Sequence, residues 1–218
     1  MLRKQFEEEL ESLHEEFYEM GLRAGEAVAK ATEAFVNHDK ELANTVILED
    51  ARINQCEVNL EKKSYELLAL QQPVTKNLRI LVTILKASSD LERIGDHAVS
   101  IAKATIRVKG KQRVPYIEQD ISEMSKATLR MVDAVLHAYI KTNTKKAKEI
   151  AKEDDQINAY FKKIYQNTLK EMRENKETII GGADYLQVAG YLERIGDYVT
   201  NVCEWIVYLE TGKISELG

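Results

Sequence analysis

A six-residue string, Leu-Glu-Arg-Ile-Gly-Asp, occurs twice in this 218-residue chain, at positions 91–96 and 192–197. Each copy holds a glutamate and an aspartate four residues apart: Glu92 with Asp96, and Glu193 with Asp197. On a helix, residues at this spacing stand on one face a turn apart, so their carboxylates repel unless a cation or a basic partner lies between them. An oxygen-rich site of this kind suits Mg, Ca, Mn or iron and differs from a thiolate zinc site. Each string is therefore a candidate metal site.

Hairpin geometry brings a third acid toward each string. If the chain folds back at Pro73 and again at Asn175, one acid of the preceding helix reaches the height of each string. These acids are Asp50 for the first string and Asp154 for the second. Three carboxylates at one level would complete an oxygen-rich metal site.

Two interpretations of these acids stay open. They bind a metal ion, or they form a structural cluster held by salt bridges, which a duplication would also copy. Each string also places a glycine in mid-helix, Gly95 and Gly196, at a cost of roughly 1 kcal/mol relative to alanine. Close helix contact or access to the carboxylates would compensate for that cost. His97 follows the first string and Tyr198 the second, so a histidine ligand would not be symmetric.

Other catalytic arrangements are absent from the sequence. It contains no nucleophile–base pair, no phosphate-binding loop and no dinucleotide fingerprint. Glu11-x-x-His14 matches half of the signature of di-iron helical bundles, but a second Glu-x-x-His does not occur. We therefore expect His14 to be a surface residue, and we expect no enzymatic activity.

The strings belong to a longer internal repeat. Apolar residues from Phe6 to Ala34 follow steps of four and three, the spacing of helices in bundles. The same steps return from Ile117 to Ala138, each residue 104 positions after its counterpart between Leu13 and Ala34, whereas the strings are 101 residues apart. The second copy has thus lost three residues between its second and third helices. A repeat of this length defines the organisation of the whole fold.

Turn signals divide each copy into three helices of roughly 30 residues, about 45 Å long. The signals are Asn37-His38-Asp39 and Thr142-Asn143-Thr144, then Gln72-Pro73 and Asn175, with a linker at 108–115. Long helices joined by short turns pack antiparallel. The sequence predicts an all-α fold of two tandem antiparallel three-helix bundles, residues 1–109 and 110–218.

Composition agrees with long helices and limits the function classes. The chain has 2 Pro and 10 Gly, and 31 Lys and Arg against 36 Asp and Glu give a net charge of −5. No Lys/Arg-rich run stands out, so we expect no nucleic-acid partner. The two cysteines form no Cys-x-x-Cys pair. Without a signal peptide or a long apolar stretch, the protein is expected to be cytoplasmic and not inserted in a membrane.

With its two strings, the Leu78-Arg79 pair and the segments 198–204 and 208–212, the chain resembles the PhoU family over nearly its whole length. The resemblance implies a cytoplasmic homodimer without a catalytic step, which restrains the phosphate-specific ABC transporter and phosphate-starvation signalling. It implies contacts with the transporter's ATPase subunit and a phosphate-sensing histidine kinase. The family's metal motif falls on the acids of the two strings, where some members bind iron or zinc.

Two other functions remain as alternatives. A carboxylate-rich helical bundle could be a di-iron-like enzyme or a metal store, which requires redox-active iron and an open coordination position. The chain could also be a structural helical scaffold whose acids are salt-bridged. The regulatory interpretation agrees best with the long helical faces and the lack of catalytic motifs.

Overall fold

The computed structural model describes residues 2–107 and 112–218, which contain helices and no strand. The first repeat consists of α1 (Leu2–Asn37), α2 (Lys40–Gln71) and α3 (Thr75–Arg107). The second consists of α4 (Pro115–Ile140), α5 (Thr144–Ala151), α6 (Asp154–Glu174), the 3-10 turn η1 (Lys176–Thr178) and α7 (Ile179–Thr211). The all-α prediction is confirmed. The boundary predicted between residues 109 and 110, and half of the predicted linker, lie outside the described residues.

The first turn of each repeat has the same construction. Asp39 caps α2 by accepting hydrogen bonds from the backbone N–H groups of Glu41 and Leu42, and Asn143 caps α5 by accepting one from Lys146. Such side-chain caps satisfy N–H groups that the helix itself leaves unpaired. The preceding residues at equivalent positions, His38 and Thr142, both have left-handed backbone, with φ of 56° and 46°.

The second repeat differs from the prediction in one respect. Its second helix is not continuous like α2 but breaks at Lys152–Glu153 into α5 and α6. The charges at the break suit two helix ends, because Lys148 lies in the last turn of α5 and two aspartates lie in the first turn of α6. The predicted helix of roughly 30 residues is therefore two shorter ones.

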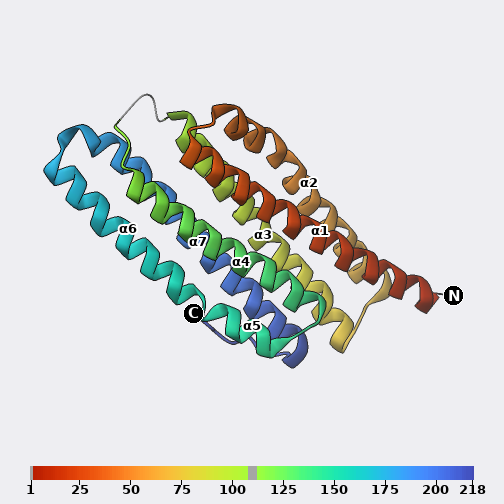
Figure 1. Ribbon diagram of the computed structural model, residues 1–218. Helices are drawn as coiled ribbons and strands as arrows, with labels where there is room; N and C mark the ends of the chain where they lie inside the picture. Colours follow the sequence, from red (N-terminus) through yellow and green to blue (C-terminus); the bar gives the residue numbers. More distant parts are fainter. Residues whose placement is uncertain (1, 108–111) are drawn as a thin grey trace.

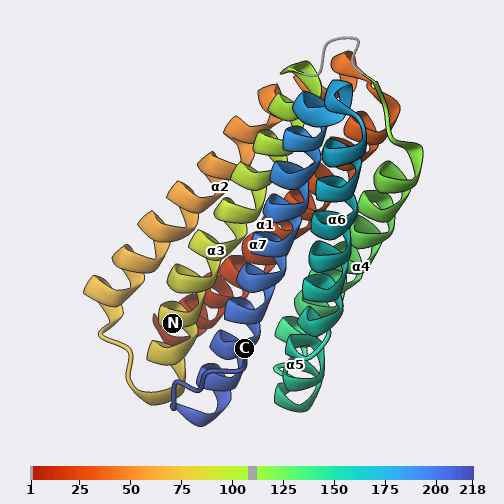
Figure 2. The same cartoon turned by 90° about the vertical axis from the view of Figure 1, so that its left-hand side faces the viewer.

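The two repeats pack side by side as one elongated bundle (Figure 1). Helices α1, α3, α4 and α7 form its centre, α2 covers α1 and α3, and α6 covers α4 and α7 (Figure 2). The largest contact between any two helices joins α3 of one repeat to α7 of the other. A single cluster of buried apolar side chains runs through both repeats. The repeats are therefore distinguishable by sequence but share one core.

Equivalent helices of the two repeats meet antiparallel. The hydroxyl of Ser125 on α4 donates to Thr32 on α1 at 3.0 Å, and His14 near the start of α1 contacts Tyr139 near the end of α4. Likewise, Arg107 at the end of α3 contacts Asp184 near the start of α7. Antiparallel contact of repeat equivalents is the arrangement that an approximate internal two-fold axis produces.

Candidate functional site

The two Leu-Glu-Arg-Ile-Gly-Asp strings lie midway along α3 and α7, which pack antiparallel over their whole length. The imidazole of His97, which follows the first string, stacks on the rings of Tyr191 and Tyr198, with ring centres 5.5 and 5.6 Å apart. Tyr198 occupies the position in the second repeat that His97 occupies in the first. The two residues that break the symmetry of the sequence therefore stack on each other across the internal axis.

Arginines of the strings complete this contact. The guanidinium of Arg93 lies 5.8 Å from the ring centre of Tyr198, a cation–π distance. Burial lowers the pKa of His97, and the positive charge of the repeat-equivalent Arg194 lowers it further. His97 thus serves the contact between the repeats, and the charges of both arginines act on it.

Asp50 of α2 lies against the first string. A side chain at Gly95 would place its Cβ 3.1 Å from Ile53 Cδ1 and 3.7 Å from Asp50 Oδ1. The glycine therefore allows α2 to approach α3 at this point. Asp50 Oδ2 accepts a hydrogen bond of 3.2 Å from Asn54, whereas its Oδ1 is buried and has no hydrogen-bond partner. Such an orphaned carboxylate oxygen is unusual in a folded protein.

The acids around the first string repel one another. Burial raises the pKa of Asp50, and the charge of Asp96 raises it further. The same two causes, burial first, raise the pKa of Glu92 to about 7. Glu57 of α2, which the sequence analysis did not identify, adds to the shift of Glu92, and its own pKa is raised by burial and by Glu61. At neutral pH this cluster favours a bound proton or another cation.

The second string has the same arrangement. Asp154 Oδ2 accepts a hydrogen bond of 2.8 Å from Asn158, and its Oδ1 is again buried without a partner. A Cβ at Gly196 would overlap this Oδ1. Burial, followed by the charge of Asp197, raises the pKa of both Asp154 and Glu193. The structure thus brings Asp50 and Asp154 to equivalent positions beside the two strings, as the hairpin geometry predicts.

The donor chemistry and the geometry give different answers about a metal. Half-buried carboxylates with orphaned oxygens fit a hard cation such as Mg, Mn or iron. However, within residues 2–107 and 112–218 no three His, Cys, Asp or Glu side chains are gathered so that they could hold a metal ion. The carboxylates are neighbours of suitable type and would have to turn toward an ion to enclose it.

A second acidic position was missed by the sequence analysis. Asp90, directly before the first string, accepts hydrogen bonds of 3.2 Å from Asn201 and from the Trp205 indole of α7. Burial raises the pKa of Asp90 despite these two bonds. Asp90 forms part of an open groove of 630 Å³ between α2, α3 and α7. Only the juxtaposition of the two repeats reveals this residue, because its repeat equivalent is Tyr191.

His14 also differs from expectation. It is half-buried, its Nδ1 lies 2.6 Å from the Tyr139 hydroxyl, and burial lowers its pKa. The expectation of a surface residue was wrong because Tyr139, from the other repeat, covers this side of α1. His14 is a packing contact at the α1–α4 interface.

Comparison with known proteins identifies the class. The family model for the PhoU domain matches the chain twice, at residues 17–105 and 121–206. Two relatives, each called a phosphate-specific transport system accessory protein PhoU homolog, are 39% identical over the whole of both chains. They come from Streptococcus pneumoniae and Clostridium acetobutylicum.

Solved structures agree with the sequence matches. The crystal structure of the phosphate transport system regulatory protein PhoU from Streptococcus pneumoniae superposes with a TM-score of 0.91 at 37% identity, covering 96% of this chain and 99% of that one. PhoU from Pseudomonas aeruginosa gives a TM-score of 0.90 at 30% identity, over 95% and 100% of the two chains. The chain belongs to the PhoU family, which consists of accessory and regulatory proteins and not of enzymes. Membership supports a role in the regulation of phosphate transport.

Proposed function

We propose that this protein restrains the phosphate-specific ABC transporter and switches off phosphate-starvation signalling when phosphate is plentiful. The observation that carries the proposal is the match over the full length of both chains to accessory proteins of the phosphate-specific transport system. Both repeats are included in the family match, which agrees with such an accessory role.

The proposed partners are the transporter's ATPase subunit and a phosphate-sensing histidine kinase, met from the cytoplasmic side by a homodimer. The outer helix α2 supports docking by a helical face, because Leu48, Val58 and Tyr65 on it are 78%, 54% and 55% exposed. Val58 and Tyr65 lie seven residues apart, two helical turns, so they share one side of α2. No described helix is long and apolar enough to cross a membrane.

We further propose that the acids beside the strings bind metal ions, iron or zinc, or else Mg or Mn. Asp50, Glu92 and Asp96 would hold the first ion, and Asp154, Glu193 and Asp197 the second. Support comes from the orphaned oxygens of Asp50 and Asp154 and from the raised pKa values around them. A bound cation would supply the positive charge that these carboxylates lack and would join α2 to α3 and α6 to α7.

A deletion strain tests the regulatory role. Without the gene, we expect phosphate uptake and starvation-gene expression to remain high in phosphate-rich medium, and we expect the wild-type gene to restore repression. Normal uptake and normal expression in the deletion strain would contradict the proposal. A pull-down from phosphate-replete cells, probed for the transporter ATPase, tests the partner separately.

Metal binding needs its own measurement. A cation that binds only the folded chain raises the melting temperature, by an amount that grows with its concentration. We expect Mn, Fe, Zn or Mg to stabilise the purified protein. The combined variant Glu92→Gln, Asp96→Asn, Glu193→Gln and Asp197→Asn should lose this shift. An unchanged melting temperature with all four metals would favour the structural interpretation of the acids.

A further inference from the structure

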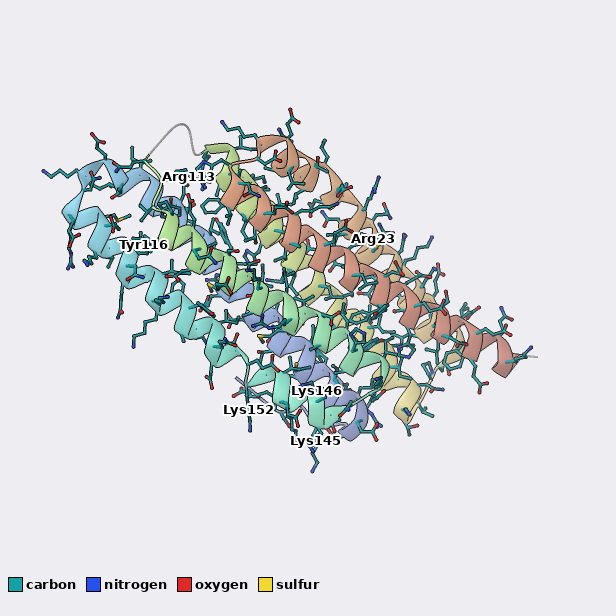
Figure 3. All side chains as sticks on the ribbon, in the orientation of Figure 1. Arg23, Arg113, Tyr116, Lys145, Lys146 and Lys152 are labelled. Atoms are coloured by element: carbon teal, nitrogen blue, oxygen red, sulfur yellow. The ribbon has the colours of Figure 1, made fainter. Side chains whose placement is uncertain are left out.

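Helix α5 carries a row of lysines along its exposed side. Lys145 and Lys148 lie on α5, and Lys152 follows its last residue in helical backbone conformation. The spacing of three and four residues places the three lysines on one side, and all three are exposed. The opposite side of α5, Ala147 with Ile150, is buried. We name Lys145, Lys148 and Lys152 the α5 lysine face. Figure 3 places Lys145, Lys146 and Lys152 together at one edge of the molecule.

The α5 lysine face lacks counter-charges from the protein. Lys146 forms the ion pairs with the neighbouring acids: its Nζ lies 3.7 Å from Glu149 Oε2 and 4.0 Å from Glu153 Oε1. The three lysines of the face, and Lys141 just before α5, form no ion pair with a described residue. These ammonium groups are therefore free to meet an external anionic surface.

The lysines do not derive from the repeat. Segment 141–155 contains five lysines and four acids, whereas its equivalent in the first repeat, segment 37–51, contains four acids but one lysine. The positions equivalent to Lys145, Lys148 and Lys152 hold glutamate, asparagine and leucine. The turn before α5 does not need these lysines either, because the first repeat builds the equivalent turn before α2 without them. Their concentration on one edge therefore requires an explanation other than folding.

Charge is not distributed evenly along the segment. Asp154 turns its Oδ1 inward to Gly196. Glu149 and Glu153 are exposed but pair with Lys146. Asp155 is therefore the one exposed acid of segment 141–155 that is not engaged in these contacts. Ile140, directly before the turn, is 53% exposed. An exposed apolar residue beside unpaired lysines is the combination that binds at the headgroup level of anionic membranes.

We propose that the α5 lysine face docks the protein on a bilayer surface that carries anionic phospholipids. Lysine is a flexible point charge without a fixed bonding geometry, which suits the diffuse negative charge of headgroups better than a shaped protein pocket. The docking is peripheral and leaves α5 folded on the bundle. It would hold the protein near the plane of a membrane transporter, but it goes beyond the proposed function, since vesicles contain no transporter.

Vesicle flotation with the full chain tests the proposal. We expect binding to vesicles of phosphatidylcholine mixed with phosphatidylglycerol, weak binding to pure phosphatidylcholine, and loss of binding at high salt. Each lysine near an anionic surface strengthens binding about fivefold, so the variant Lys145→Gln/Lys148→Gln/Lys152→Gln should bind about a hundredfold more weakly.

The matched control changes net charge equally at exposed lysines elsewhere, as Lys40→Gln/Lys62→Gln/Lys170→Gln. This control should bind within about threefold of the wild type, and circular dichroism should show that both variants are folded. Absence of binding to anionic vesicles would overturn the proposal, as would equal weakening by the two triple variants. Neither result would affect the deletion phenotype, so the deletion strain tests the proposed regulatory function independently.

Discussion

The two repeats carry the same string but surround it differently. In the first repeat, α2 passes Asp50 as one continuous helix, and Glu57 on the same helix adds a further negative charge beside Glu92. In the second, the helix is interrupted directly before Asp154, which therefore lies in the first turn of α6. Both repeats nevertheless keep an orphaned aspartate oxygen beside a mid-helix glycine. The two repeats thus share this local arrangement, although its surroundings have diverged.

The two ends of the α1–α4 pair have also diverged. Glu118 on α4 is the repeat equivalent of His14 on α1. Glu118 accepts hydrogen bonds from Arg113, from the Tyr185 hydroxyl at 2.8 Å and from His38 at 3.2 Å. Burial alone would raise the pKa of Glu118, but these hydrogen bonds lower it. At the other end, His14 has the single Tyr139 partner.

We expect the largest difference between equivalent substitutions in the two repeats, measured as lost free energy of unfolding, at Glu118 and His14. Glu118→Ala should lower the free energy of unfolding by about 3 kcal/mol, because it leaves a buried tyrosine and an arginine without their acceptor. His14→Ala, which breaks one hydrogen bond, should cost about 1 kcal/mol. Urea unfolding of both variants measures the two losses, and equal losses would show that the Glu118 network adds nothing to the single contact.

The next largest difference in stability is expected when the glycine of each string is replaced by alanine. Gly95→Ala gains helix propensity of about 1 kcal/mol, which its close contact with Ile53 largely offsets, so stability should change little. Gly196→Ala should instead destabilise by about 2 kcal/mol, because the new Cβ displaces the buried oxygen of Asp154. Thermal melts in metal-free buffer compare the two variants. Equal effects would mean that Asp154 turns away without cost.

The smallest expected effect is a pH dependence. Since the pKa of Glu92 in the folded chain is about 7, the folded state binds more protons than the unfolded state between about pH 4.5 and 7. This acid therefore makes the free energy of unfolding fall as pH rises through that window. Glu92→Gln removes the contribution, so the variant should gain stability relative to wild type from pH 5 to pH 7.

Solvent screening of a half-exposed carboxylate limits this gain to the order of 1 kcal/mol. Glu193→Gln should gain less, because Asp197 and Asp154 act on Glu193, whereas Asp96, Glu57 and Asp50 act on Glu92. Urea titrations at several pH values, with a chelator present, measure both variants. A flat difference between Glu92→Gln and wild type would show that neither burial nor the neighbouring acids raise the pKa of Glu92.

Helix spacing and turn positions in the sequence predicted which acids of the candidate site lie near one another. The four-residue spacing placed each pair of acids on one face, and the turns at Pro73 and Asn175 brought Asp50 and Asp154 to the strings. Glu57 was missed because it has no equivalent in the second repeat. The stacking of His97 on Tyr198 was missed because the two residues belong to different repeats.

The sequence by itself determined the helices, most of their ends and the duplication, because helical periodicity, capping residues and repeated strings depend on residues close together in the chain. The break before α6 is the exception, since no proline or glycine announces it. Only the tertiary structure decided how the repeats meet: the stacking of His97 on Tyr198 and the burial of Asp90 and Glu118. These features depend on the packing of α3 against α7 and of α1 against α4. Each repeat supplies only half of such a contact, so residues close together in the chain cannot predict it.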